Sequence, residues 1–223
     1  MRFSLQLVMT ELKLKQKYIT LDSDTRLYGL SIPIIGLTGS IATGKSTVSN
    51  HLKKLGFPLI DADELVHKIY KDQSTITLVN SLSPQSIKDE EIHFPTLREA
   101  FFKDEFIQQK LENHIYARLP SEFEKAMKLF NAPSFVVYDV PLLFEKKLKP
   151  LIDVSVCVYC SEETQIQRLI ARDKISQDLA KSILDKQISI EQKRKQSDHI
   201  INNNGDLDDI SMKIQDVTLL LFE

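Results

Sequence analysis

Apolar and polar positions repeat in a strand-then-helix pattern from residue 32 onward. The short apolar run IPIIGL predicts a strand, which the stretch TGSIATG ends. From Ser46, the residues Val48, Leu52 and Leu55 fall on one face of a helix, and Gly56 is well placed to end it. The next run, FPLI, predicts a second strand, and DELVHKIY after it predicts a second helix.

The same pattern returns in the second half of the chain. SFVVYDV and DVSVCVY are continuous apolar runs, as expected of strands buried on both faces of a parallel sheet. SEETQIQRLIARD then predicts a helix and HIIN a short last strand. Regularly spaced apolar residues predict a final amphipathic helix: Leu207, Ile210, Ile214, Val217 and Leu221. The sum predicts a doubly wound α/β domain with a mainly parallel five-stranded sheet flanked by helices.

Two segments lack this regularity. Residues 1–31 carry alternation in ELKLK and YITL, which predicts a strand or hairpin. We treat them as an N-terminal extension of unknown role before a main domain at 32–223. Residues 72–95 are polar and contain two prolines, so we expect irregular structure there, followed by a long helical stretch from LREAFF to MKLF.

Composition and charge argue against a nucleic-acid-binding, membrane or secreted protein. The chain has 223 residues and a net charge of −2, which gives no support for an electrostatic grip on nucleic acid or on a membrane surface. It contains no run of roughly 18 apolar residues and no secretory signal, so we expect a cytoplasmic protein. Cys157 and Cys160 have C-x-x-C spacing but fall in a predicted strand, where residues three apart face opposite sides, so we interpret them as ordinary strand residues.

The octet GSIATGKS at 39–46 fits G-x-x-x-x-G-K-[ST] between a predicted strand and helix. Glycines let successive N–H groups turn toward phosphate oxygens, and the helix N-terminus adds positive potential. Lys45 would neutralise β- and γ-phosphate charge, and the Ser46 hydroxyl would bind Mg²⁺. The motif therefore predicts nucleotide binding by Gly39, Ile41, Ala42, Thr43, Gly44, Lys45, Ser46 and Thr47.

A P-loop does not by itself distinguish a GTPase, an ATPase motor and a small-molecule kinase. The guanine-reading N-K-x-D element is absent, and the small size argues against a motor. Asp61 and Asp63 close the second strand, at the sheet edge where ligands of open α/β sheets gather. One of these acids can accept a proton from an acceptor hydroxyl, while the other caps the next helix. A helix cap plus a surface acid is the alternative interpretation.

Five blocks, in order, resemble the dephospho-coenzyme A kinase family: IGLTGSIATGKSTV, LGFPLIDAD, VVYDVPLLFE, ETQIQRLIARD and ISQDLAKSILDKQISIEQKRKQSDHIINNNGDL. The ordered set is far more specific than any one block. The resemblance implies a P-loop kinase with a helical substrate-side region at about 72–132 and a lid at about 161–196. It implies ATP-dependent phosphorylation of the ribose 3′-hydroxyl of dephospho-coenzyme A, giving coenzyme A and ADP, the last step of coenzyme A synthesis.

The resemblance also implies residue roles. Asp63 would be the base or orienting group for the 3′-hydroxyl. Arg168 and Arg172, which share a helix face, would be the lid arginines over ATP, with surface ion pairing as the alternative. The segment Asn203-Asn204-Gly205 would lie near the adenine, with Asn204 as the chosen contact, in what is otherwise an ordinary turn. Independently of the resemblance, Asp139 ends a buried strand as a Walker-B-like carboxylate does, which makes it a candidate Mg²⁺ ligand through a water. The substrate-side residues would be Thr38, Asp63, Leu142, Leu143 and Glu145, with core packing as the competing account for both leucines.

Some positions depart from the family pattern. Val66-His67 stands where the family usually has an alanine–arginine pair, and Tyr116-Ala117 where it has a histidine–proline pair. The connecting region with its usual Arg-x-x-Leu is short and altered, and all three departures lie on the acceptor side. They keep open a kinase of another nucleoside or small alcohol, and a non-catalytic nucleotide-binding module is a third alternative.

Overall fold

The computed structural model describes residues 12–205 and 209–223. The chain divides into two compact units, which we describe separately. The core unit comprises Met1–Ile60 and Ala132–Glu223, and the inserted unit comprises Asp61–Asn131. Leu207, predicted to belong to the last helix, lies outside the described residues.

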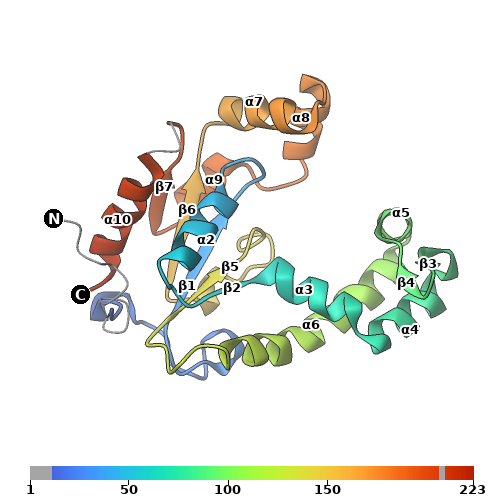
Figure 1. Ribbon diagram of the computed structural model, residues 1–223, viewed down its shortest axis with the longest axis horizontal. Helices are drawn as coiled ribbons and strands as arrows, with labels where there is room; N and C mark the ends of the chain where they lie inside the picture. Colours follow the sequence, from blue (N-terminus) through green and yellow to red (C-terminus); the bar gives the residue numbers. More distant parts are fainter. Residues whose placement is uncertain (1–11, 206–208) are drawn as a thin grey trace. The chain divides into compact units, whose positions relative to one another are not determined.

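The core unit is built on a five-stranded sheet with the order β2-β5-β1-β6-β7 (Figure 1). The strands are β1 (Ile34–Gly39), β2 (Leu59–Asp61), β5 (Val136–Asp139), β6 (Val154–Tyr159) and β7 (His199–Asn202). β1 pairs in parallel with β5 and with β6, and β6 pairs in parallel with β7. The predicted mainly parallel sheet is confirmed. Strand β1 lies in its centre, so the loop that follows β1 emerges at the middle of one sheet edge.

The helices of the core unit are α2 (Lys45–Lys54), α7 (Glu162–Asp173), α8 (Gln177–Leu184), α9 (Ile190–Gln196) and α10 (Ile210–Leu221), with 3₁₀ turns η1 (Gln16–Tyr18), η2 (Leu27–Gly29) and η4 (Lys149–Leu151). Helices α2, α9 and α10 pack on the sheet, whereas α7 and α8 pack on each other and on Ile41 and Ala42 of the loop after β1. Ile35 and Leu37 of β1 share one core cluster with residues of α2 and α10. Cys157 and Tyr159 of β6 pack instead with Ile190 of α9. Because successive side chains of a strand point to opposite faces of the sheet, one face packs on α2 and α10 and the other on α9.

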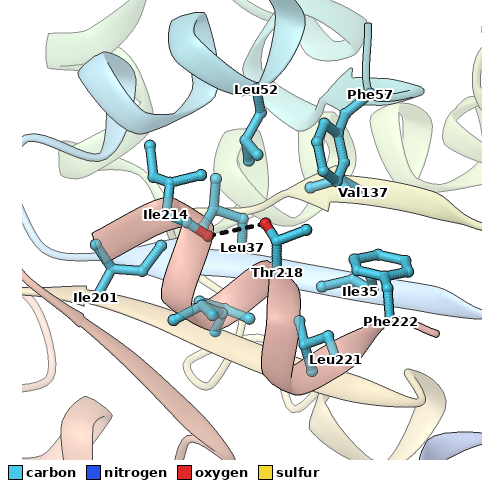
Figure 2. Close-up of a pocket in the computed structure, with 12 residues that line it drawn as sticks. Ile35, Leu37, Leu52, Phe57, Val137, Ile201, Ile214, Thr218, Leu221 and Phe222 are labelled. Atoms are coloured by element: carbon cyan, nitrogen blue, oxygen red, sulfur yellow. Dashed lines mark hydrogen bonds between the residues drawn. The ribbon is translucent and has the colours of Figure 1, made fainter. Parts of the chain in front are cut away.

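A small cavity lies in the first of these core clusters (Figure 2). Its volume is about 30 Å³, and side chains of the sheet, α2 and α10 line it. Thr218 is a polar residue in this lining, and its hydroxyl donates to the Ile214 carbonyl oxygen of the same helix at 2.8 Å. A space of that size holds at most one water, so it is a packing gap and no substrate site.

Residues 12–33, before β1, pack within the core unit, but over these described residues the predicted strand or hairpin is wrong. Within residues 12–31 the only β-type pairing is an isolated bridge between Leu14 and Phe222. Arg26 is 5% exposed and forms a buried ion pair with Asp153 at 2.8 Å. The same carboxylate oxygen, Oδ2 of Asp153, also accepts from the backbone N–H of Ile34 at 2.8 Å, so the ion pair connects Arg26 to the first residue of β1.

The inserted unit is mostly helical. It contains α3 (Ala62–Lys71), α4 (Gln73–Leu82), η3 (Pro84–Ser86), the hairpin strands β3 (Ile87–Lys88) and β4 (Glu91–Ile92), α5 (Phe94–Lys103) and α6 (Glu105–Met127). The irregular structure predicted for 72–95 is therefore wrong, because α4 buries Val79 in a cluster with Leu97 of α5 and Leu111 of α6. Asp104 divides the predicted long helix in two by capping α6. Across the described residues, no helix has the length and apolar composition needed to span a membrane.

Candidate active site

The P-loop connects β1 to α2 and adopts a conformation that its sequence makes accessible. Ala42 and Gly44 have φ angles of 62° and 87°, both left-handed. A Cβ atom on Gly44 would lie 2.2 Å from Nδ2 of Asn203, so a side chain there would be excluded by sterics as well as by φ. A Cβ on Gly39 would lie 2.9 Å from the Val158 carbonyl oxygen. Gly39 is thus required by the close approach of a backbone carbonyl group, and Gly44 by its left-handed φ and its contact with the Asn203 side chain.

The turn of this loop leaves three backbone N–H groups without a hydrogen-bond acceptor among the described residues. The N–H groups of Gly44, Lys45 and Ser46 donate to no acceptor among the residues that the structure describes. They stand at the start of α2, which carries no side-chain cap. Unpaired N–H groups at a helix N-terminus attract anions, so the loop offers a cradle that fits phosphate. Of the other predicted loop residues, Ser46 is exposed, Thr43 is buried, and Ile41 and Thr47 are half-buried.

Lys45 is held by an acid at the end of β5. Its Nζ lies 2.5 Å from Oδ1 of Asp139, and the Ser49 hydroxyl donates to the other carboxylate oxygen at 2.5 Å. Asp139 is fully buried, and so the pair fixes the lysine beside the loop. The structure therefore brings together the predicted phosphate lysine and the predicted Walker-B-like acid.

The two predicted lid arginines differ in what they contact. Arg168 of α7 reaches the P-loop, where Nη1 lies 3.5 Å from the Ala42 carbonyl oxygen and 3.4 Å from that of Thr43. Its Nη2 donates to the Asn203 carbonyl oxygen at 2.9 Å. Arg172 is exposed and pairs with its neighbour Asp173 at 2.7 Å. Of the two arginines, Arg168 contacts the P-loop and Arg172 does not.

The polar turn after β7 meets the P-loop through Asn203, the neighbour of the residue that we chose from this segment as the nucleotide contact. Asn203 is 1% exposed, and its Nδ2 donates to the Thr43 carbonyl oxygen at 2.8 Å. The predicted residue, Asn204, is exposed, and its Oδ1 accepts from the backbone N–H of Ser161 at 2.8 Å. The sequence signal was the run of three asparagines, which marks the turn without saying which side chain faces inward.

Apart from Asp63, the predicted substrate-side residues lie on β1 and on the turn after β5. The Thr38 hydroxyl donates to the Pro141 carbonyl oxygen at 3.2 Å. Leu143 is fully buried and would contact a Cβ on Gly36 at 3.1 Å, which is core packing, whereas Leu142 is 36% exposed. Glu145 forms an ion pair with Lys193 at 2.8 Å.

Lys193 was missed by sequence reasoning, although its side chain is wholly buried. The signal was its position three residues after Ile190, which places both on one face of α9. A lysine on a buried face is not expected without acidic partners, and the sequence does not say which acid pairs with it.

Asp61 and Asp63 stand at the start of the inserted unit. The Asp61 carboxylate caps α3, accepting from the backbone N–H of Asp63 at 2.8 Å and of Glu64 at 3.3 Å. The structural role expected for Asp61 is confirmed. Asp63 follows on the first turn of α3 and is exposed, and its catalytic role stays a prediction.

Comparison with known proteins agrees with this geometry. The family model described as dephospho-CoA kinase matches residues 33–209. The chain belongs to the dephospho-CoA kinase family. A dephospho-CoA kinase of Fusobacterium nucleatum is 36% identical over 188 residues, covering 83% of this chain and 97% of that protein. One of Listeria monocytogenes is 34% identical over 179 residues, covering 78% and 90%.

Two solved structures share the fold. The dephospho-CoA kinase from Campylobacter jejuni has a TM-score of 0.60 at 28% identity, covering 83% of this chain and 95% of that chain. A Thermus thermophilus protein, TT1252, has a TM-score of 0.75 at 25% identity, covering 85% and 97%. The predicted P-loop kinase architecture and the predicted kinase class are both confirmed.

Proposed function

We propose that the chain transfers the γ-phosphoryl group of ATP to the ribose 3′-hydroxyl of dephospho-coenzyme A, giving coenzyme A and ADP. Membership of the dephospho-CoA kinase family supports the reaction and its acceptor, and the P-loop supports ATP as the phosphoryl donor. The observation that carries the proposal is the set of unpaired N–H groups of Gly44, Lys45 and Ser46 beside the Lys45 ammonium. These donors match the charge that phosphoryl transfer must hold.

ATP binding would change the partners of the cations around the P-loop. Lys45 Nζ would keep one contact with Asp139 while it turns a proton toward the β- and γ-phosphates. Arg168 would remain on the loop and support its carbonyl groups from α7. Arg172 would leave Asp173 and close over the nucleotide, which costs little because an exposed ion pair stabilises by only about 0–1 kcal/mol.

The residues present also fit a magnesium ion. The Ser46 hydroxyl is exposed at the loop, beside the proposed phosphate position, and the buried carboxylate of Asp139 lies within reach of the Lys45 side chain. We propose Ser46 as a direct ligand and Asp139 as a partner through a water, the oxygen chemistry that Mg²⁺ prefers. When bound, the ion would neutralise charge on the phosphate oxygens.

Asp63 is proposed as the group that orients or deprotonates the 3′-hydroxyl. The two neighbouring acids would have different roles, because the Asp61 carboxylate already caps α3 and Asp63 would act on the hydroxyl. Thr38, Leu142, Leu143 and Glu145 are proposed to line the acceptor side. The helical region at about 72–132 is proposed as the substrate-side region, and residues 161–196 are proposed as the lid. A cytoplasmic location, and the absence of nucleic-acid or membrane partners, stay predictions.

The test is a coupled assay of ADP formation by the purified chain with ATP, Mg²⁺ and dephospho-coenzyme A. Asp63→Asn should lower the turnover number by roughly 10²- to 10⁴-fold, the range for loss of a positioned base, and leave the ATP dissociation constant nearly unchanged. The matched control is Asp61→Asn, because asparagine caps a helix as well as aspartate does and turnover should persist. Near-normal turnover of Asp63→Asn would remove Asp63 from the mechanism.

The identity of the acceptor is tested separately, because Val66-His67 and Tyr116-Ala117 depart from the family pattern. The same assay would be run with a panel of nucleosides and small alcohols. Dephospho-coenzyme A should be the preferred acceptor. If it were inert while another alcohol turned over, the alternative of a different kinase substrate would replace our proposal, and ATP binding without any product would favour a non-catalytic module.

A further inference from the structure

A buried ammonium lies beneath the P-loop. Lys193 is 0% exposed, and its Nζ donates to the Pro141 carbonyl oxygen at 2.7 Å. The same nitrogen lies 2.8 Å from Oε1 of Glu145 and 3.5 Å from the Gly39 carbonyl oxygen. An unpaired charge in such a place would cost several kcal/mol, so the fold keeps Lys193 only while these acceptors stay where they are.

The acceptors come from different segments of the proposed site. Gly39 opens the P-loop, which would hold ATP. Pro141 and Glu145 belong to the turn after β5, which we propose for the acceptor side. Lys193 itself stands on α9, at the end of the proposed lid region. One ammonium therefore connects the donor loop, the acceptor turn and the lid within the core unit.

Neighbouring hydrogen bonds tighten the same cluster. The Pro141 carbonyl oxygen also accepts from the Thr38 hydroxyl, and Glu145 Oε1 also accepts from the backbone N–H of Ile188 at 3.2 Å. The second carboxylate oxygen of Glu145, Oε2, is buried and has no hydrogen-bond partner among the described residues. Lys193 thus fixes one oxygen of Glu145 and leaves the other free to accept.

We infer that Lys193 is a positioning residue, which holds the turn at 141–145 in register with the P-loop and aims Glu145 Oε2 at the bound acceptor. The inference rests on the proposed function. Lys193 acts through the Pro141 carbonyl and the Glu145 carboxylate, and touches neither substrate. Its loss is expected to weaken use of the acceptor more than binding of ATP, because its contact with Gly39 is the longest of the three.

Lys193→Met tests this, since methionine keeps most of the side-chain volume without the charge. We expect kcat/KM for dephospho-coenzyme A to fall roughly 10- to 100-fold, with the ATP dissociation constant within about threefold of wild type. All kinetics are measured well below each variant's Tm. The matched control is Lys195→Met, since Lys195 is exposed on the same helix and should behave as wild type. Lys193→Arg, which keeps the charge, should recover part of the loss.

A purely structural role would lower Tm in Lys193→Met while leaving kcat and KM at wild-type values, and that result would overturn the inference. Should this variant fail to fold, Glu145→Gln carries the test, because the amide keeps the shape but removes the charge that Lys193 orients. The expected result is a loss of kcat/KM for dephospho-coenzyme A in the same direction. Wild-type kinetics in Glu145→Gln would overturn the inference as well.

Failure of the proposed function gives a different result. Wild-type protein that never phosphorylates dephospho-coenzyme A would overturn that function alone. Amide hydrogen exchange then tests Lys193 without any acceptor. Lys193→Met should speed exchange at residues 142–148 relative to wild type and to Lys195→Met, whereas unchanged exchange there would overturn the positioning role.

Discussion

At the scale of single residues, the cations around the P-loop are held by the protein's own oxygens. Lys45 is paired with Asp139, and Arg168 donates to carbonyl groups of the loop and of Asn203. These contacts order the cations before any nucleotide arrives. Preordered donors stabilise developing charge without a cost of reorganisation during the reaction.

The two arginines of α7 should therefore give different kinetic defects. Arg168→Ala removes several charge-assisted contacts to the loop and should weaken ATP binding about tenfold or more. Arg172→Ala removes only the pair with Asp173 from the free protein, so the ATP dissociation constant should change by less than about threefold while turnover falls. Isothermal titration and steady-state rates separate these effects. Normal turnover of Arg172→Ala would exclude Arg172 from the closed lid.

The two cysteines should be chemically inert. Burial raises the pKa of the Cys157 thiol to about 12 and also raises the pKa of the Cys160 thiol, and both residues are free. The thiolate is the reactive form, so at pH 8 a thiol reagent should label neither residue in the native protein and both after denaturation. Rapid native labelling, followed by mass spectrometry, would contradict this. The C-x-x-C spacing would then need a redox explanation.

How far the sequence predicts single residues depends on whether a motif fixes their direction. The P-loop motif does, because its tight turn requires the glycines and so fixes where the lysine that follows them must lie. Asn203 and Asn204 are neighbours of one type, and only tertiary packing determines that Asn203 faces the loop. Lys193 has no motif of its own, since its partners lie on other segments of the chain.

At the scale of elements, the segment before β1 is fastened by a buried ion pair. Arg26→Met would leave the carboxylate of Asp153 buried without its guanidinium, and breaking one side of such a pair costs about 3–5 kcal/mol. Chemical denaturation should show that loss in the free energy of unfolding. As a control, Lys213→Met removes a longer and more exposed pair with Asp209 in the same unit. Its cost should stay below about 1 kcal/mol. Equal effects would contradict the anchoring role of Arg26.

The elements of the core unit were predictable and those of the inserted unit were less so. Apolar runs such as VVYDV fill the buried strands, and their pattern is strong. Helix α4 buries Thr75 beside Val79, and a threonine at an inward position weakens the apolar stripe on which the prediction depends. The division between α5 and α6 depends on the single cap at Asp104, inside a sequence that otherwise reads as one helix.

At the scale of the whole molecule, acid should destabilise the fold partly through its histidines. Burial is the main cause that lowers the pKa of His199, opposed by nearby Asp198 and assisted by Lys17 and Lys149. Burial likewise lowers the pKa of His114.

A folded-state pKa below the unfolded value means that the unfolded chain binds more protons, so stability falls as the pH drops through the ordinary histidine range near 6.5. The measurement is Tm at pH 7.5 and pH 5.5 for wild type and His199→Gln. The variant should lose less Tm on acidification than wild type does. An equal loss in both proteins would show that His199 contributes nothing to the acid sensitivity.

The pairing of Leu14 with Phe222 has a practical consequence for shortened versions of the chain. The region recognisable by family likeness runs from 33 to 209, yet Leu14, Phe222 and the buried side of α10 all belong to the same apolar cluster as β1. A chain cut to residues 33–209 would lack Leu14, Phe222 and the apolar side of α10, which cover one side of that cluster. It would leave the aromatic rings of Phe57 and Phe135 open to water, and we expect such a fragment to precipitate during expression.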